Sequence, residues 1–138
     1  MGLCVDPVST DVFATMVFDD AGTYRNKITR FRSHADGLTA ASASDILVMS
    51  KDEMWGNAHQ IQQCSIGPDG KLYVNVGNGD QPSLSQDLNS LQGKILRMQL
   101  DGSAPEDNPF FEAFAMRLNR YDRGKPEVRR SVEAGWDI

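Results

Sequence analysis

Hydrophobic and polar residues follow one another in short runs that predict β-strands separated by turns. β-Branched and aromatic residues fill residues 12–18, and residues 27–32 alternate with the period of two that is typical of a half-buried strand. Turn-forming residues separate the runs, as in the Gly-Pro-Asp-Gly sequence at 67–70. Shorter apolar runs predict further strands at residues 3–5, 46–49, 63–66, 72–76 and 94–100. The pattern therefore predicts an all-β chain.

The predicted strands recur as an internal repeat, which indicates an architecture before any single motif does. Each copy is a small antiparallel sheet, and radially repeated sheets of about four strands form a β-propeller. Three pairs of segments share their pattern: residues 2–7 with 63–68, residues 12–17 with 72–77, and residues 26–31 with 93–98. We therefore predict about two four-stranded antiparallel blades, at residues 2–50 and 60–110.

Two blades are too few for a closed propeller. A ring takes roughly four to eight blades, because each blade needs a neighbour on both faces. We therefore expect this chain to be a fragment or part of an assembly. Met1 is followed directly by strand-like sequence, without the charged and apolar regions of a secretory signal, which favours a truncated chain.

Composition and charge narrow the function classes. Of the 138 residues, 40% are hydrophobic and 24% are charged, which is ordinary for a globular protein. The net charge of −5 argues against nucleic-acid and anionic-membrane partners, since both need clustered lysine and arginine. The basic residues between 117 and 130 alternate with acidic ones and are typical of a solvated tail. No apolar run approaches the roughly 18 residues of a membrane span.

The two cysteines, Cys4 and Cys64, lie in apolar strand-like runs. Free cysteine in such a run behaves as a small buried hydrophobic residue. Two cysteines are too few for a disulfide scaffold or a zinc site, but one bridge between them is possible. The sequence leaves both alternatives open.

His59 is the first candidate for chemistry. A single histidine is more often a surface or core residue than a catalyst, but this one lies at the entry to the innermost strand of a predicted blade, where sites are usually found. Histidine acts as a general base near neutral pH when a carboxylate orients its other ring nitrogen. The hairpin that follows returns the chain towards His59, so Asp80 is the candidate carboxylate and Asn78 competes with it. The alternative is that residues 77–80 form only a turn.

Four segments, His59-Gln60 and residues 66–74, 86–97 and 101–110, form an ordered series. This series is similar to the soluble aldose sugar (glucose/sorbosone) dehydrogenases that use pyrroloquinoline quinone (PQQ). Residues 2–7 and 26–31 match that family's preceding blade, so the resemblance covers about residues 2–110. The remaining residues, 111–138, form a divergent tail.

This resemblance implies a six-bladed propeller with PQQ and a calcium ion in its central cleft, exported to the periplasm or outside the cell. His59 matches the base that takes a proton from the anomeric hydroxyl of an aldose while hydride passes to the quinone. The aspartate that orients this base in the family falls at Asn78, with Asp80 reachable by a two-residue shift. Asparagine would hold the ring but would not stabilise an imidazolium by charge. Gln60 is the predicted cofactor contact.

Other parts of the family's pattern are not found in this chain. A cofactor-contacting glutamine would precede Met1, the Arg-Asn-Pro motif is replaced by Arg-Leu-Asn-Arg at 117–120, and the later blades with the calcium ligands are missing. The acidic residues at 101–108 lack EF-hand spacing, so no metal ligand is predicted. We therefore expect the isolated chain to be inactive, and a complete ring of six blades would require a homotrimer. The alternative function is a non-catalytic propeller module that binds carbohydrate or protein.

Overall fold

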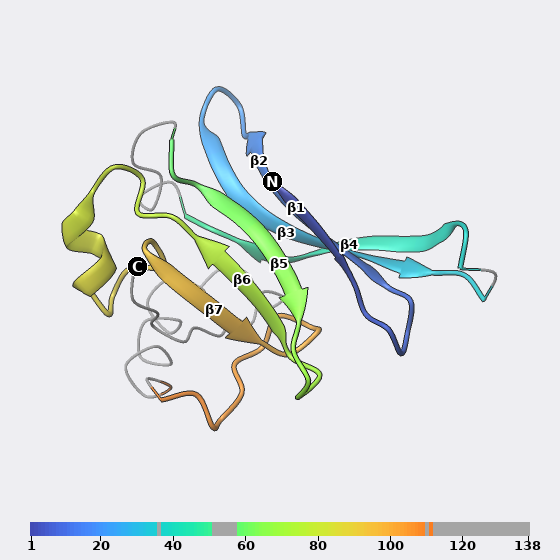
Figure 1. Ribbon diagram of the computed structural model, residues 1–138. Coiled ribbons are helices and arrows are strands. Elements are labelled where there is room, and N and C mark those ends of the chain that lie inside the picture. The colour runs from blue at the N-terminus through green and yellow to red at the C-terminus, as the bar shows by residue number, and fades with distance from the viewer. Residues whose placement is uncertain (36, 51–57, 110, 112–138) are drawn as a thin grey trace.

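The computed structural model describes residues 1–35, 37–50, 58–109 and 111, and these residues form two antiparallel sheets (Figure 1). The first sheet has the order β1-β2-β3-β4, and the second has the order β5-β6-β7. A short 3-10 helix, η2 (Pro82–Gln86), lies between β6 and β7. The strands are β1 (Gly2–Val5), β2 (Val12–Asp19), β3 (Tyr24–Ser33), β4 (Ala40–Val48), β5 (Ile61–Ile66), β6 (Leu72–Val76) and β7 (Lys94–Met98). The prediction of an all-β chain is confirmed.

Several strand boundaries differ from the sequence prediction; β3 begins at Tyr24 rather than at residue 27, and β5 begins at Ile61 rather than at residue 63. Two further differences have a visible cause. β4 begins at Ala40 rather than at residue 46, because the alanine and serine residues at its start pair with β3 as far as Ser33. β7 ends at Met98, since a turn follows it in which the Gln99 amide donates to the Ser103 carbonyl and the Gly102 amide donates to the Gln99 carbonyl. β7 is also the last strand of the second sheet in the described part of the chain, so this sheet has three strands there instead of the predicted four. The predicted tail lies outside the described residues except for residue 111.

The core lies between the two sheets and receives side chains from both. β6 shows the alternation most clearly, since Leu72, Val74 and Val76 are buried while Asn75 is exposed. The fully buried apolar side chains form one cluster, which includes Phe13, Ile28, Leu47, Met49, Ile61, Leu72, Val74, Leu91, Leu96 and Met98. Among the described residues, no helix has the length and hydrophobicity to cross a bilayer.

A disulfide between Cys4 and Cys64 joins β1 of the first sheet to β5 of the second. The two Cα atoms are 5.7 Å apart, within the usual range for a disulfide. The Thr15 hydroxyl also donates to the Gln62 carbonyl, so β2 and β5 are linked beside the disulfide. Of the two alternatives that the sequence left open, the structure contains the bridge.

The face of β1 that points away from the second sheet is apolar. Leu3 and Val5 alternate with Cys4 along the strand, and they are 66% and 54% exposed. A sheet that packs on one side only leaves such residues uncovered. The first sheet therefore presents an apolar strand to solvent in this chain.

Candidate functional site

His59 and Asp80 lie together at one end of the second sheet. His59 precedes β5 and Asp80 follows β6, and the antiparallel pairing of Ile61 with Val76 brings these two ends side by side. The Nε2 atom of His59 is 3.7 Å from the Oδ1 atom of Asp80, and the two side chains are 64% and 58% exposed. This distance exceeds a hydrogen bond but is within the roughly 4 Å of an ion pair. The pair is an imidazole with a carboxylate beside it, an arrangement in which histidine can act as a general base.

Two glycines hold the backbone of His59. The Gly77 amide donates to the Gln60 carbonyl at 3.2 Å, and the Gly79 amide donates to the His59 carbonyl at 3.0 Å. A Cβ atom on Gly77 would collide with the His59 carbonyl and would lie 2.9 Å from its Cα atom. The approach of the two chain segments therefore requires glycine at position 77.

His59 and Asp80 both have left-handed backbone conformations, with φ values of 52° and 64°. For a residue other than glycine this conformation costs roughly 1–2 kcal/mol. It persists only where the surrounding structure enforces it, and such residues are concentrated at functional sites. At His59 the hydrogen bond from the Gly79 amide to the carbonyl contributes to this, and at Asp80 the hydrogen bond from its amide to Asn78 does so.

Asn78 shapes the turn between the two glycines. Its Oδ1 atom accepts a hydrogen bond from the Asp80 amide at 3.1 Å, and its carbonyl accepts one from the Gln81 amide at 3.0 Å. The carboxylate that the structure places beside the imidazole is that of Asp80. The roles of His59, Asp80 and Asn78 in catalysis remain predictions.

Gln60 points into the protein, where it forms part of a buried polar link. Its side chain is 7% exposed, accepts a hydrogen bond from Asn26 at 2.8 Å and donates one to the Ala58 carbonyl at 3.0 Å. Asn26 is fully buried, and its Oδ1 atom also accepts from the Ile61 amide at 3.3 Å. Asn26 was not among the residues predicted from the sequence, although it occupies the same face of β3 as the buried Ile28. This link anchors the start of β5 directly behind His59, and a contact of Gln60 with a cofactor remains a prediction.

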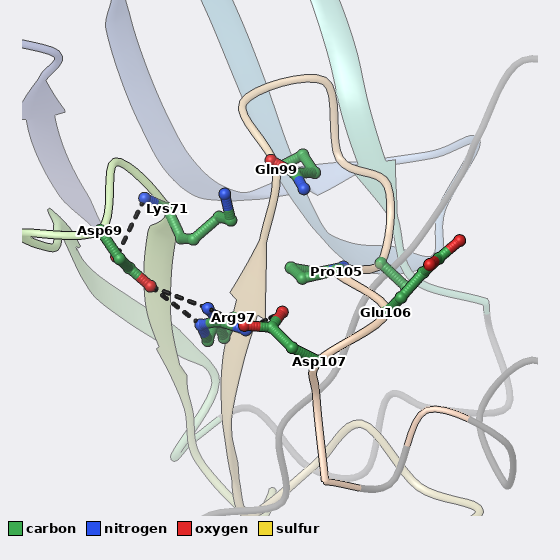
Figure 2. A pocket seen from close by; sticks show the side chains of 8 residues that line it. Asp69, Lys71, Arg97, Gln99, Pro105, Glu106 and Asp107 are labelled. Carbon is green, nitrogen blue, oxygen red and sulfur yellow. Dashed lines mark hydrogen bonds and ion pairs between the residues drawn. The ribbon is translucent and has the colours of Figure 1, made fainter.

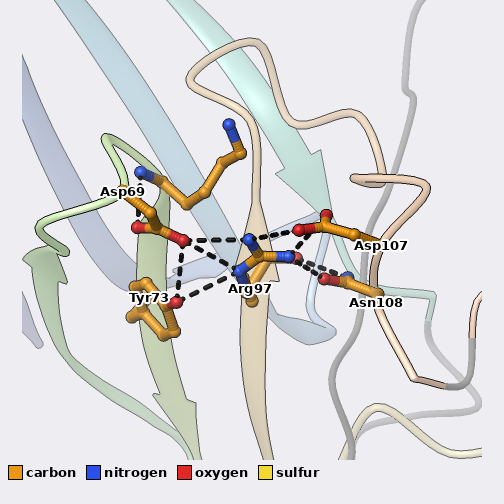
Figure 3. Close-up of polar contacts among 6 residues, drawn as sticks. Asp69, Tyr73, Arg97, Asp107 and Asn108 are labelled. Carbon is orange, nitrogen blue, oxygen red and sulfur yellow. Dashed lines mark hydrogen bonds and ion pairs between the residues drawn. The ribbon is translucent and has the colours of Figure 1, made fainter.

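A second polar cluster lies at the opposite end of the second sheet, around Arg97 of β7 (Figure 3). The Arg97 side chain is 11% exposed. It donates to Asp69 at 2.9 Å, to Tyr73 at 3.1 Å, to Asp107 at 2.8 Å and to Asn108 at 2.6 Å. The guanidinium therefore fastens the loop after β7 to the turn between β5 and β6.

The ionisation of this cluster follows from the same contacts. The hydrogen bond from Arg97 lowers the pKa of Asp107. Burial opposes a similar shift in Asp69, but hydrogen bonds from the Lys71 amide, Arg97 and Tyr73 outweigh it, so the pKa of Asp69 is also lowered. Burial and the bond to Asp69 raise the pKa of Tyr73. These contacts stabilise Asp69 and Asp107 as carboxylates and Tyr73 as a neutral phenol, the forms that their hydrogen bonds require. This indicates a structural role for the cluster.

A hollow of about 580 Å³ adjoins this cluster (Figure 2). Lys71 and Gln99 extend over it, while Asp69, Arg97 and Asp107 form its charged wall. The charged groups of this wall are paired with one another, since Arg97 forms ion pairs with both Asp69 and Asp107. They include no nucleophile with a base beside it. In the described segments, no group of three or more histidine, cysteine or acidic side chains is arranged to hold a metal ion. The His59 end is therefore the candidate site.

Replacing Arg97 with methionine is expected to lower the melting temperature by several degrees at pH 6 and by much less at pH 2. The pKa values of Asp69 and Asp107 are lowered from the usual 3.8 in the folded chain, so their contribution to stability is present above pH 3.8 and is lost as the pH falls through the lowered values. Thermal unfolding followed by circular dichroism at both pH values measures this. Arg32→Met, at an exposed position on β3, is the control, and an equal loss for Arg97→Met at both pH values would contradict the prediction.

Comparison with known proteins gives matches in sequence. The model of the glucose/sorbosone dehydrogenase family matches residues 4–125, and so extends past residue 110. An aldose sugar dehydrogenase of Escherichia coli is 38% identical over 55 residues, which are 40% of this chain and 15% of that protein. Quinoprotein glucose dehydrogenase B of Acinetobacter calcoaceticus is 28% identical over 88 residues, which are 50% of this chain and 18% of that protein.

Solved structures match over more of the chain. A glucose dehydrogenase from Thermus thermophilus superposes with a TM-score of 0.67 and 28% identity, over 96% of this chain and 36% of that one. The PQQ-bound aldose sugar dehydrogenase from Streptomyces coelicolor superposes with a TM-score of 0.62 and 30% identity, over 80% of this chain and 33% of that one. The chain thus spans about a third of these structures and less than a fifth of the two curated relatives.

Proposed function

The chain belongs to the glucose/sorbosone dehydrogenase family, and on that premise we propose that it provides the proton-accepting part of a PQQ-dependent aldose dehydrogenase. The family match confirms the resemblance seen in the sequence, and the two packed sheets are neighbouring blades of a β-propeller. The observation that supports the proposal most directly is the imidazole of His59, 3.7 Å from the carboxylate of Asp80 at the end of the second blade.

In the proposed reaction His59 accepts the proton of the anomeric hydroxyl of an aldose. Asp80 lies on the Nε2 side of the ring, so Nδ1 is the nitrogen left to face the substrate. Proton transfer makes an imidazolium, and the negative charge of Asp80 favours that form. When bound, the quinone would supply the redox chemistry, which is the acceptance of hydride from the anomeric carbon.

The described residues fit the proton transfer, but they do not fit the binding of the quinone. PQQ carries three carboxylates, whereas the described cations on the strands near this end are engaged. Arg25 pairs with Asp20 at 2.7 Å, Lys27 pairs with Asp45 at 3.2 Å, and the ammonium of Lys94 donates to backbone carbonyls. The described segments also contain no arranged group of metal ligands for calcium. We therefore propose that other parts of a longer protein hold PQQ and calcium.

The disulfide supports the proposal that this protein works outside the reducing cytosol. Disulfides such as that between Cys4 and Cys64 persist in the periplasm and in secreted proteins, and are rare where thiols are kept reduced. A periplasmic or secreted location agrees with a quinone-dependent sugar dehydrogenase. The proposal thus rests on a feature that is independent of the family match.

Dye-linked oxidation of aldoses in the presence of PQQ and calcium tests the function. The longer protein is expected to reduce the dye with glucose or another aldose, and the isolated 138-residue chain is expected to be inactive because it does not hold the quinone. Activity of the isolated chain would show that these 138 residues suffice. A longer protein that folds but does not bind PQQ would favour the alternative, a propeller module that binds carbohydrate or protein.

A further inference from the structure

The ammonium group of Lys94 is buried at the start of β7, where it donates hydrogen bonds to three backbone carbonyls. The residue is 3% exposed, and its Nζ atom donates to the carbonyls of Leu84 at 2.7 Å, Ser85 at 2.8 Å and Gln92 at 2.9 Å. Lysine is almost never fully buried unless its charge has partners. This side chain is therefore an internal cross-link between β7 and the loop that precedes it.

Two of these carbonyls belong to η2, the short helix in the loop between β6 and β7 (Figure 1). This helix has five residues, and the side chain of its N-cap residue, Gln81, makes no capping hydrogen bond. A helix of this length is not stable by itself, so tertiary contacts must hold it. Gly93 permits the contact with Lys94, because a Cβ atom at its φ of 65° would lie 2.6 Å from the Cα atom of Ser85.

The anchored loop leads directly to the candidate site. The Gly93 amide donates to the Gly77 carbonyl at 3.0 Å, and the Gly79 amide donates to the His59 carbonyl at 3.0 Å. Asp80 thus lies between Gly79, whose amide is bonded to the His59 carbonyl, and η2, which begins two residues after Asp80. A shift of η2 away from Lys94 would move Asp80 relative to the imidazole.

We propose that Lys94 is the positioning residue for Asp80. Its ammonium holds η2 against β7 and so fixes the carboxylate beside His59, without touching the substrate or the ring. The inference rests on the proposed function, in which Asp80 orients the base.

Nuclear magnetic resonance of the 15N-labelled chain tests this without cofactor or substrate. In Lys94→Met, the protection of the Gly79 and Gly93 amides from hydrogen exchange is expected to fall at least tenfold, and the His59 ring signals are expected to move to the positions they have in Asp80→Asn. Arg97→Met removes another largely buried cation from the same strand and is expected to leave both readouts unchanged. Unchanged ring signals despite loss of protection would overturn the proposal, since Lys94 would then be structural only.

Gly93→Ala provides a second variant in case Lys94→Met does not fold. It leaves the ammonium in place and pushes Ser85 away, so the same movement of the His59 signals is expected, and its absence would also overturn the proposal. In the longer protein with PQQ, Lys94→Met is expected to lower kcat about 10–100-fold with little change in KM, since small misplacements of an orienting group cost this much. A wild-type protein without sugar oxidation would refute the proposed function, while the ring signals would still decide the role of Lys94.

Discussion

Replacing His59 with asparagine is expected to lower kcat for aldose oxidation by roughly 10²–10⁴-fold, the usual contribution of a positioned general base. Asparagine tolerates the left-handed conformation that His59 adopts at a φ of 52°, so this variant removes the base without adding backbone strain. The measurement is the dye-linked rate of the longer protein with PQQ and calcium at saturating aldose. A variant with more than about a third of the wild-type kcat would rule out His59 as the base.

Two further variants make this result specific. Asp80→Asn keeps a side chain of the same shape but removes the charge that favours the imidazolium, so a smaller loss of kcat is expected than for His59→Asn. His34→Asn changes the other histidine of the chain, which is exposed at the end of β3, and no change in rate is expected. If Asn78→Ala lowered kcat more than Asp80→Asn, the orienting role would belong to Asn78.

Removing the disulfide by replacing Cys4 and Cys64 with alanine is expected to lower the free energy of unfolding by about 4 kcal/mol. The bridge closes a loop with a sequence separation of 60 residues, and the chain-entropy relation gives about this value for such a loop. Urea unfolding of the chain, followed by circular dichroism, measures the change. The bridge also joins the two blades through β1 and β5, so its loss weakens the packing on which the start of β5 depends.

Reduction of the wild-type chain is the matched control for this variant. Under a reductant the wild type should unfold at nearly the same urea concentration as the double alanine variant, because both lack the cross-link. Equal midpoints for the oxidised wild type and the variant would show that the bridge contributes nothing to stability. A large difference between the reduced wild type and the variant would instead show that alanine disturbs the packing around the buried Cys64.

The strands were predictable to the extent that their residues alternate. β6 alternates buried and exposed residues, and its predicted bounds agree with the structure. The start of β4 carries only alanine and serine, whose exposed positions show no alternation, so its length depends on pairing with β3. The family resemblance could also be recognised from the sequence, because it lies in segments of consecutive residues that form an ordered series of turns and strands.

The sequence by itself determined the all-β fold, the repeat of two blades, and the candidates His59, Asp80, Asn78 and Gln60, because alternation, turn residues and motifs are properties of neighbouring positions. Only the tertiary structure decided which candidates meet. The left-handed conformations at 59 and 80 and the approach of Gly77 place Asp80 beside the imidazole, whereas Gln60 turns inward to Asn26. The sequence left the bridge between Cys4 and Cys64 open, because it joins strands of two different sheets. It did not show the partners of Lys94 and Arg97, because these contacts depend on how the neighbouring loops fold back onto β7.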